Sequence, residues 1–204
     1  FFGDGATEEG VFHESMNLAA VKKLPVVFVC EHNFFSSHLH VSLRQPADST
    51  CRYAVAHCVP WRRVDGNDVV AVSNAMEEAA THVRAGGGPF YIEAVTYRMS
   101  LHTTADDPTV YRHEHEVEPW KCKCPILRFE LYLKKKGLLT DSSIEEMAEQ
   151  CSDEVIAARD KFYAMTSANP SEIFDHIYEE IPQELKEQRE EYLKRLRQKG
   201  VDNE

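Results

Sequence analysis

The sequence predicts an α/β fold with a mostly parallel sheet in three layers, followed by a helical region. Through residues 1–124, amphipathic helix patterns alternate with short unbroken apolar runs, which are typical of parallel strands buried on both faces. From residue 125 onward the helix patterns continue and the strand patterns stop. We therefore expect an α/β domain over residues 1–124 and a helical extension over residues 125–204.

The first predicted unit is a helix followed by a strand. Residues 6–21 carry an apolar stripe, and Glu8 and Glu9 lie near its start, where the helix dipole favours acidic side chains. Pro25 then opens the apolar run 26–30, which has the length of a buried strand. A Gly-Asp-Gly turn precedes the helix after only two residues, so we expect the sequence to begin inside a fold.

The second predicted unit repeats this order. Residues 69–83 have a helix pattern with Asn67 or Asp68 as the N-cap, and a glycine-rich turn separates them from an apolar strand over residues 90–95. Ligands of parallel sheets bind beyond the carboxyl ends of the strands. Three segments that follow strand ends are therefore expected to line one crevice: residues 3–6, 31–35 and 96–112.

The region after residue 125 is predicted to be helical and acidic. Helices are expected over residues 126–136, 143–165, 173–181 and 182–199. Residues 141–204 hold 17 acidic and 8 basic residues. The region carries no catalytic motif, so we expect it to pack on its own chain or on a partner.

The composition excludes several classes of partner. The chain has 204 residues and a formal net charge of −11, which argues against nucleic acid or an anionic membrane as the main partner, because both need a basic face. It contains no run of about 18 apolar residues, as a membrane-spanning helix requires. Its six cysteines are too sparse for a disulfide scaffold, so a reducing compartment is expected.

Asp4 and Asn33 are the first candidate site residues. A Gly-Asp-Gly turn is by itself most often structural. One helix and one strand later, however, Asn33 returns to the same edge of the predicted sheet. Carboxylate and amide oxygens are the ligands that Mg²⁺ prefers, and the adjacent helix start suits a diphosphate. The spacing therefore predicts a metal and diphosphate site.

The run from Gly3 to Asn33 resembles the thiamine diphosphate motif of the alpha subunit of 2-oxoacid dehydrogenases, the decarboxylating components of the pyruvate and branched-chain 2-oxoacid complexes. The likeness continues through residues 64–68 and 92–108 and into the helical tail. It implies a thiamine diphosphate-binding fold, of which residues 1–124 would be the C-terminal part, and thiamine diphosphate and Mg²⁺ as cofactors.

The resemblance also assigns roles to single residues near the turn. It implies that Asp4 and Asn33 ligate Mg²⁺ through their side chains and that Phe35 does so through its backbone carbonyl. Gly5 and Ala6 would contact the diphosphate through main-chain groups. A carbonyl ligand does not depend on its side chain, so Phe35 is acceptable where the family usually has tyrosine.

His32 and Leu101 depart from the family pattern. We interpret His32 as a histidine at the rim of the pocket, packed on Phe34, because Mg²⁺ prefers oxygen ligands to nitrogen. Leu101 stands where relatives carry a small residue, proline or histidine, and it leaves the fit of the substrate open.

His102 is the candidate catalytic residue. A histidine on a loop after a strand end can exchange a proton near neutral pH. The resemblance places His102 at the active-site histidine of the family, on a loop that orders over the cofactor. Arg98 would anchor this loop or meet the phosphates. Further residues would hold the loop by ion pairs and hydrogen bonds: Asp106, Asp107, Tyr111 and Arg112.

The function that the resemblance implies is oxidative decarboxylation of a 2-oxoacid with transfer of the acyl group to lipoamide, whose disulfide is the acceptor. Pyruvate is the first expectation and a branched-chain 2-oxoacid the alternative. The implied partners are the beta subunit, in a heterotetramer, and the lipoyl-bearing acyltransferase. The expected location is the bacterial cytoplasm or the mitochondrial matrix. We expect the chain alone to be inactive, because relatives carry upstream strands that complete the diphosphate site.

Two alternatives come from other classes of protein. The chain could be a noncatalytic truncated remnant that serves as an interaction module through its acidic helices. It could also belong to another thiamine enzyme such as a transketolase, although the loop around His102 and Thr103 points to the dehydrogenases.

Three smaller motifs have plain structural interpretations. The Cys122-Lys123-Cys124 run is expected to be a loop, because a single C-x-C is weak evidence for metal. His38 and His40 alternate like the residues of a strand with a solvated face. Residues 113–115 are expected to form a surface loop.

Overall fold

The computed structural model describes residues 1–165 and 169–200. It divides into two compact units, Phe1–Thr140 and Asp141–Glu204. Helix α5 (Pro125–Lys135), which the sequence pattern assigns to the helical extension, falls in the first unit. Arg128 of this helix donates to the Asp65 carboxylate and to the carbonyl oxygen of Asn67, which ties α5 to the α/β part. The predicted boundary at 124/125 therefore differs from this division by one helix.

The first unit is built on a four-stranded parallel sheet with the strand order β1-β2-β6-β5. Its strands are β1 (Phe2–Gly3), β2 (Val27–His32), β5 (Trp61–Asp65) and β6 (Phe90–Val95). The central pair β2 and β6 is in register over six residues, from Val27 beside Phe90 to His32 beside Val95. The predicted parallel sheet and the strand at 90–95 are confirmed, and the strand expected at 26–30 extends to His32.

Strand β5 was not predicted. It carries two adjacent arginines, Arg62 and Arg63, and all of its residues except the half-buried Val64 are exposed. It lies at the edge of the sheet, where one row of backbone groups lacks a neighbouring strand and the side chains are mostly exposed, so an apolar run is not required. The periodicity that marks a buried strand is therefore missing.

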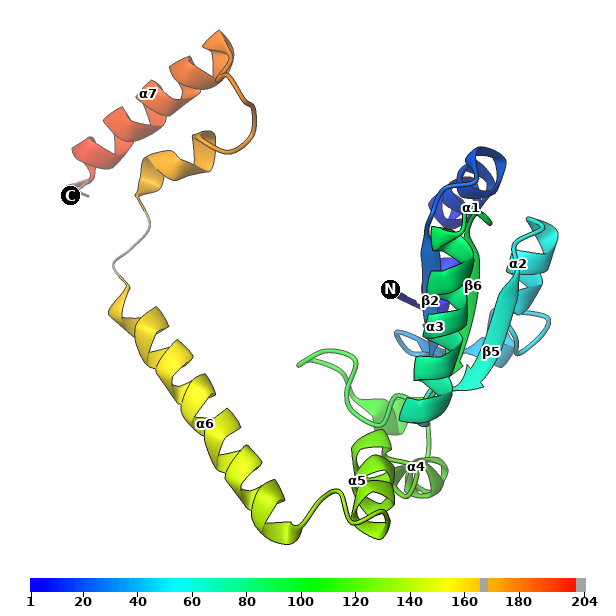
Figure 1. The fold of residues 1–204 in the computed structure, drawn as a ribbon. Helices are drawn as coiled ribbons and strands as arrows, with labels where there is room; N and C mark the ends of the chain where they lie inside the picture. Colours follow the sequence, from blue (N-terminus) through cyan, green and yellow to red (C-terminus); the bar gives the residue numbers. More distant parts are fainter. Residues whose placement is uncertain (166–168, 201–204) are drawn as a thin grey trace. The chain divides into compact units, whose positions relative to one another are not determined.

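Helices cover both faces of the sheet, which confirms the three layers (Figure 1). Helices α1 (Gly10–Lys22) and α2 (Cys51–Ala56) pack on one face, and α3 (Val69–Arg84) packs on the other. The first cluster comprises Phe12, Met16, Cys30, Cys51, Ala54, Val59 and Tyr91. The second comprises Ala75, Ala79, Val83, Phe90 and Ile92. As predicted, Asp68 caps α3, accepting hydrogen bonds from the N–H groups of Val70 and Ala71.

The helix predicted over residues 6–21 is divided in two. Its start is a separate 3-10 turn, η1 (Asp4–Glu8), and α1 begins at Gly10. The Thr7 hydroxyl donates to the carbonyl oxygen of Asp4 at 2.6 Å and closes the turn, and Glu9 then adopts an extended backbone conformation. The acidic turn therefore lies directly after β1 and is distinct from the long helix.

A short antiparallel hairpin follows β2. It consists of β3 (Phe35–Ser36) and β4 (Leu39–His40), and η2 (Val41–Leu43) comes next. His38 lies at the exposed tip, as expected for a solvated face. His40 has a structural role instead, because its Nδ1 accepts the N–H of Ser42 and caps η2.

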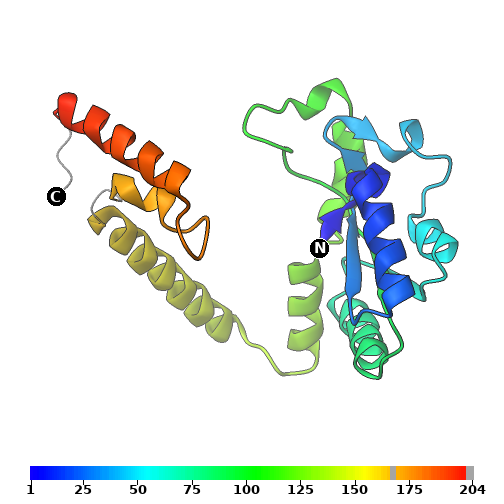
Figure 2. The same ribbon diagram turned by 90° about the horizontal axis from the view of Figure 1, so that it is seen from above.

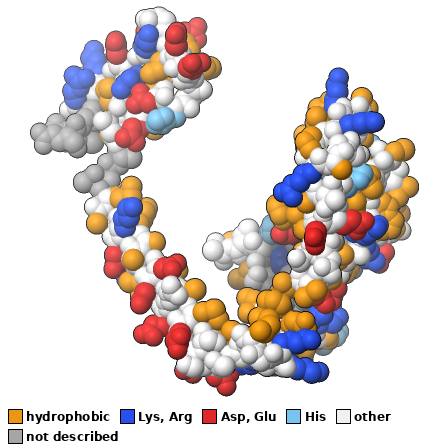
Figure 3. Space-filling model, in the orientation of Figure 1, with side chains coloured by type: hydrophobic (Ala, Val, Ile, Leu, Met, Phe, Trp, Pro, Cys, Tyr) orange, Lys and Arg blue, Asp and Glu red, His pale blue; other side chains and the backbone are white. Residues whose placement is uncertain are grey.

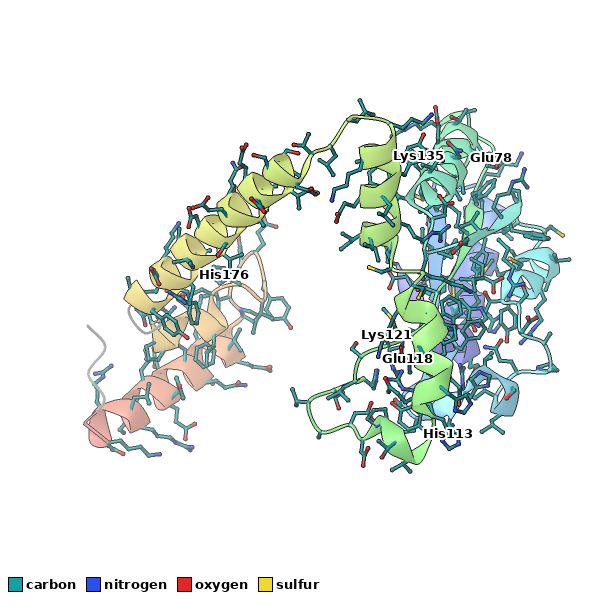
Figure 4. The ribbon with its side chains drawn as sticks, turned by 90° about the horizontal axis from the view of Figure 1, so that it is seen from below. Glu78, His113, Glu118, Lys121, Lys135 and His176 are labelled. Atoms are coloured by element: carbon teal, nitrogen blue, oxygen red, sulfur yellow. The ribbon has the colours of Figure 1, made fainter. Side chains whose placement is uncertain are left out.

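Helix α4 (Glu114–Lys121) occupies the region that we expected to be a surface loop at 113–115. His113 and Glu116 form a capping box at its start, which explains why the histidine-rich run begins a helix. At its end, Lys121 lies 2.6 Å from Glu118 on the same helix (Figure 4). The Cys122-Lys123-Cys124 run is a turn between α4 and α5, as predicted. The loop before α4 contains η3 (Pro108–Val110).

The second unit contains α6 (Asp141–Ala164), η4 (Pro170–Phe174) and α7 (Gln183–Gln198). Acidic side chains lie along the visible face of α6 (Figure 3). Within the unit, η4 packs on α7: the rings of Phe174 and Tyr192 are 5.8 Å apart, and Arg189 forms an ion pair with Asp175.

The prediction of a helix over residues 173–181 is wrong. The 3-10 turn η4 ends at Phe174, and the residues after it form turns and bends before α7. Ile181 precedes a proline, which disfavours the helical conformation there.

Figure 2 shows the elements of each unit from above. Among the described residues, the structure contains no helix with the length and apolar character needed to cross a membrane.

Candidate functional site

The structure brings the two predicted side-chain metal ligands together. Asp4 follows β1 directly, and its side chain is fully buried. Asn33 follows β2, the strand that pairs with β1 in parallel. The backbone N–H of Asn33 donates to Oδ1 of Asp4 at 3.1 Å. The parallel pairing of two neighbouring strands thus carries both residues to one edge of the sheet.

Asn33 and Phe35 form a tight turn beside Asp4. Oδ1 of Asn33 accepts the N–H of Phe35 at 3.1 Å, and Phe34 between them has a left-handed backbone with φ 69°. The Phe35 ring is buried, with the ring of Tyr97 at 5.7 Å and that of Tyr111 at 5.6 Å. Three residues that offer oxygen atoms (Asp4, Asn33 and Phe35) therefore occupy two adjoining turns.

Gly5 and Ala6 belong to the η1 turn. A Cβ on Gly5 would lie 2.4 Å from Oγ of Ser36, so only glycine lets η1 approach the β3 strand this closely. The carbonyl oxygen of Ala6 accepts the N–H of Glu9 at 3.2 Å. Their contact with a diphosphate stays a prediction.

Arg44 is a member of the site that sequence reasoning missed. Its Nη2 donates to Oδ2 of Asp4, its Nη1 donates to Oε1 of Glu8, and its Nε donates to the carbonyl oxygen of Leu39 at 3.1 Å. The side chain is only 4% exposed. Gln45 donates to Glu8 as well, at 2.9 Å. The acidic partners of Arg44 precede it by 40 and 36 residues, so no local pattern in the sequence marks the contact.

His32 and Glu93 form a second buried pair behind the site. Nδ1 of His32 lies 2.5 Å from Oε1 of Glu93, and both side chains are fully buried. The other carboxylate oxygen accepts hydrogen bonds from the Ser49 hydroxyl at 2.6 Å and from the N–H and thiol of Cys51. Burial alone would raise the pKa of Glu93, but hydrogen bonds from His32, Cys51 and Ser49 outweigh it and lower the pKa to about 2.

This pair corrects the interpretation of His32. The predicted contact with Phe34 is present, with the rings 4.8 Å apart, but the histidine lies in the interior and not at a pocket rim. Glu93 carried the available signal, because an acid in the middle of an apolar strand needs a polar partner inside the fold.

The loop that bears His102 is held by a chain of hydrogen bonds. Arg98 donates to the carbonyl oxygen of Ser37 and to the hydroxyl of Tyr111, the latter at 2.9 Å. The Tyr111 hydroxyl donates to Oδ2 of Asp106 at 2.7 Å, and the same oxygen accepts the backbone N–H of His102 at 2.8 Å. These hydrogen bonds from His102 and Tyr111 lower the pKa of Asp106. The loop is thus tied to the β3–β4 hairpin.

The base of the loop is held from a second side. Arg112 donates to the carbonyl oxygens of Arg98, Met99 and Ser100. Beyond the last strand pair, the N–H of Thr96 donates to the carbonyl oxygen of His32 at 2.9 Å, and that of Arg98 donates to Asn33 at 3.4 Å. The pairing of β2 with β6 therefore continues into the loop.

The predicted loop residues take distinct places. Asp106, Tyr111 and Arg112 hold the loop as expected, whereas Asp107 caps η3 by accepting the N–H of Thr109. Arg98 was expected either to anchor the loop or to meet the phosphates, and its hydrogen bonds to Ser37 and Tyr111 are those of an anchor. The side chain of His102 is exposed, and its catalytic role stays a prediction.

Comparisons with known proteins place the chain in a family. The sequence matches the family described as "Dehydrogenase E1 component" over residues 1–171. It is 42% identical to the 3-methyl-2-oxobutanoate dehydrogenase subunit alpha of Mycobacterium tuberculosis, over 94% of this chain and 52% of that one. It is 37% identical to the pyruvate dehydrogenase E1 component subunit alpha of Mycoplasma genitalium, over 92% and 52%. The 2-oxoisovalerate dehydrogenase subunit alpha of Bacillus subtilis is 36% identical, over 87% and 54%.

The chain spans about half the length of these curated relatives. Among solved structures, a transketolase from Campylobacter jejuni is 24% identical, with a TM-score of 0.41, over 46% of this chain and 14% of that one. A TM-score this low carries no argument for the transketolase alternative. The family match covers most of the chain and includes every candidate site residue, so the chain belongs to the dehydrogenase E1 component family.

Proposed function

We propose that this chain is the part of a 2-oxoacid dehydrogenase alpha subunit that holds the metal and the diphosphate of thiamine diphosphate, the cofactor used in general by the family. The observation that carries the proposal is the hydrogen bond from the Asn33 N–H to Asp4 Oδ1. It joins two residues from different strand ends into one group of hard oxygen donors. Mg²⁺ is the metal proposed.

The chemistry of the donor set fits this metal. Mg²⁺ favours a small octahedral shell of oxygens and completes it with water and substrate phosphates. Asp4 supplies a carboxylate, Asn33 an amide oxygen and Phe35 a carbonyl oxygen.

Bound thiamine diphosphate supplies the electron sink for loss of carbon dioxide from a 2-oxoacid. In the proposed role, Asp4, Asn33 and the η1 turn hold its metal and diphosphate. His102 gives or takes a proton from an exposed position on its loop. Asp106 holds the backbone of His102, which fixes the place of the side chain along the loop.

Pyruvate is the substrate that we propose first, with a branched-chain 2-oxoacid as the alternative. Relatives named for each substrate match the chain with similar coverage. The names of these relatives as alpha subunits support a beta subunit as the partner. The acyl group would then pass to the lipoyl group of an acyltransferase.

The test is reconstitution of the full-length subunit with its beta partner. We expect turnover of pyruvate with a higher kcat/KM than that of 3-methyl-2-oxobutanoate, and loss of turnover in an Asp4→Ala variant. The reverse order of kcat/KM would establish the branched-chain alternative. Turnover of neither acid, with the cofactor bound, would favour a noncatalytic interaction module.

The 204-residue chain by itself is expected to bind magnesium thiamine diphosphate weakly and not to decarboxylate. It spans about half of its relatives, so residues of the remaining half are absent from such an experiment. Calorimetric titration checks this, and micromolar affinity for the isolated chain would contradict it.

A further inference from the structure

Arg44 occupies the carboxylate on which the proposed metal site depends. Oδ1 of Asp4 accepts the Asn33 N–H, and Oδ2 accepts Nη2 of Arg44. The carboxylate is fully buried and the guanidinium is 4% exposed. Both oxygens of Asp4 are therefore engaged before any metal arrives.

The rest of the Arg44 side chain is held by neighbours that do not involve Asp4. Nη1 donates to Glu8, and Nε donates to the carbonyl oxygen of Leu39. The Glu8 side chain is 34% exposed and also accepts from Gln45. If Arg44 leaves Oδ2, it still keeps one acidic partner and one carbonyl partner nearby.

Arg44 and a metal ion would compete for the Asp4 carboxylate, because both are positively charged. A guanidinium stays charged at every relevant pH, so it cannot release the carboxylate by losing a proton. A divalent cation on Oδ2 would meet a fixed positive charge at the same oxygen, and like charges that close repel strongly in a buried site. An anion bound with the metal would offset this repulsion, because its negative charge would lie near both cations.

We propose that Arg44 is a built-in cation that competes with the divalent metal for Asp4, and so makes the metal site weak until a diphosphate binds with the metal. The proposal rests on the proposed function, because it takes Asp4 as a metal ligand. Without ligands, Arg44 neutralises Asp4 and fixes the η1 turn. When the metal and the diphosphate bind together, the guanidinium moves off Oδ2 while Glu8 keeps Nη1.

The experiment measures binding of Mn²⁺, used as the probe for the metal, to the full-length subunit purified with its partner chain. Free Mn²⁺ is followed by electron paramagnetic resonance without any diphosphate. Arg44→Gln removes the charge and is expected to tighten Mn²⁺ binding about tenfold. Arg44→Lys keeps the charge and is expected to stay within about twofold of the unmodified protein.

A matched control is Arg62→Gln. Arg62 forms an ion pair with Glu78, and both side chains are about half exposed, on β5 and α3. This substitution removes the same charge from the chain without touching Asp4, so Mn²⁺ affinity is expected to stay unchanged. If Arg62→Gln tightens Mn²⁺ binding as much as Arg44→Gln does, the effect is one of net charge and the proposal is overturned.

A second measurement uses only the unmodified protein, so it does not depend on whether Arg44→Gln folds. Hydrogen exchange of peptides covering residues 39–45 is compared without ligand, with Mg²⁺ and inorganic diphosphate, and with diphosphate alone. We expect faster exchange in this segment when both ligands bind, because the link to Asp4 is released. Slower or unchanged exchange with both ligands bound overturns the proposal.

The two proposals fail in different ways. If the unmodified protein binds Mn²⁺ with thiamine diphosphate but Arg44→Gln does not tighten Mn²⁺ alone, the role of Arg44 is refuted and the proposed function stands. If neither protein binds Mn²⁺ even with thiamine diphosphate, the metal site itself is refuted and both proposals fall.

Discussion

The imidazole of His32 lies 2.5 Å from the carboxylate of Glu93, and neither side chain has any exposed surface. The pair joins the two central strands one residue before Asn33. A buried pair of this kind is costly to break, because removing one partner leaves the other unpaired inside the fold. The backbone position of Asn33, and with it the geometry around Asp4, therefore depends on a contact outside the site.

Replacing Glu93 by glutamine is expected to destabilise the protein at neutral pH by about 3 kcal/mol. The pKa of Glu93 is about 2 in the folded chain, below its ordinary value of 4.5. A lowered pKa stabilises the fold fully above pH 4.5, and this contribution is lost as the pH falls toward 2. The variant should lose less stability than the unmodified protein across that interval.

Urea denaturation at several pH values between 7 and 3 measures this difference. Glu77→Gln on α3 is the control, because Glu77 is an exposed carboxylate on the same unit. Equal loss of stability between pH 4.5 and 3 in the Glu93→Gln variant and in the unmodified protein would contradict the prediction.

Replacing Gly5 by alanine is expected to cost about 1–3 kcal/mol of stability. The new methyl group would lie 2.4 Å from Oγ of Ser36 and 2.7 Å from its Cβ, so η1 and β3 would have to separate. Gly10→Ala is the control, since a Cβ there would only meet Glu14 at an ordinary 3.9 Å. A double variant with Ser36→Gly should recover much of the loss, and a double-mutant cycle without coupling would refute the contact.

Replacing Tyr111 by phenylalanine is expected to loosen the loop that bears His102. The hydroxyl accepts a hydrogen bond from Arg98 and donates one to Asp106, so its removal interrupts this series of hydrogen bonds between Arg98 and His102. We expect the exchange protection of the His102 amide to fall about tenfold. Thr109→Val is the control, because the Thr109 hydroxyl bonds only locally, to Asp107. Unchanged protection in Tyr111→Phe would show that the Tyr111 hydroxyl does not hold the loop.

The cysteines are expected to separate into reactive and inert groups. Cys30 and Cys51 are buried, and burial raises the pKa of the Cys30 thiol to about 12 and that of Cys51 even further. Thiolates react and thiols do not, so both should resist a thiol reagent at pH 8 in the folded protein. The exposed cysteines, Cys58, Cys122 and Cys151, should be labelled first. Mass spectrometry of the labelled peptides checks the order.

The elements that could be predicted are those whose signal is local. The apolar runs of β2 and β6, and the cap of α3 at Asp68, follow from a few neighbouring residues. Edge strand β5 carries no such signal, because its two arginine side chains are exposed to solvent. The tail helix expected at 173–181 shows the opposite error, because a segment with a helix-like composition contains a 3-10 turn that ends at Phe174, followed by turns and bends.

The candidate site divides in the same way. The meeting of Asp4 and Asn33 could be predicted, because parallel strands end at the same edge of a sheet. The hydrogen bonds of Arg44 could not, because they depend on how a hairpin and a 3-10 turn fold back over dozens of residues. The prediction that His32 lies at the rim of the pocket is wrong for the same reason, since its partner Glu93 lies 61 residues away.

The backbone pairing that continues past β2 and β6 sets where a hinge can lie. Thr96 and Arg98 are fixed to the carbonyl oxygens of His32 and Asn33, so the chain cannot swing before Arg98. If the loop opens to admit a ligand, the backbone has to rotate at Met99 or beyond, and Asn33 keeps its position. Cleavage by a protease during opening should accordingly cluster between Met99 and Asp107, leaving the sheet and the turns that carry Asp4 and Asn33 intact.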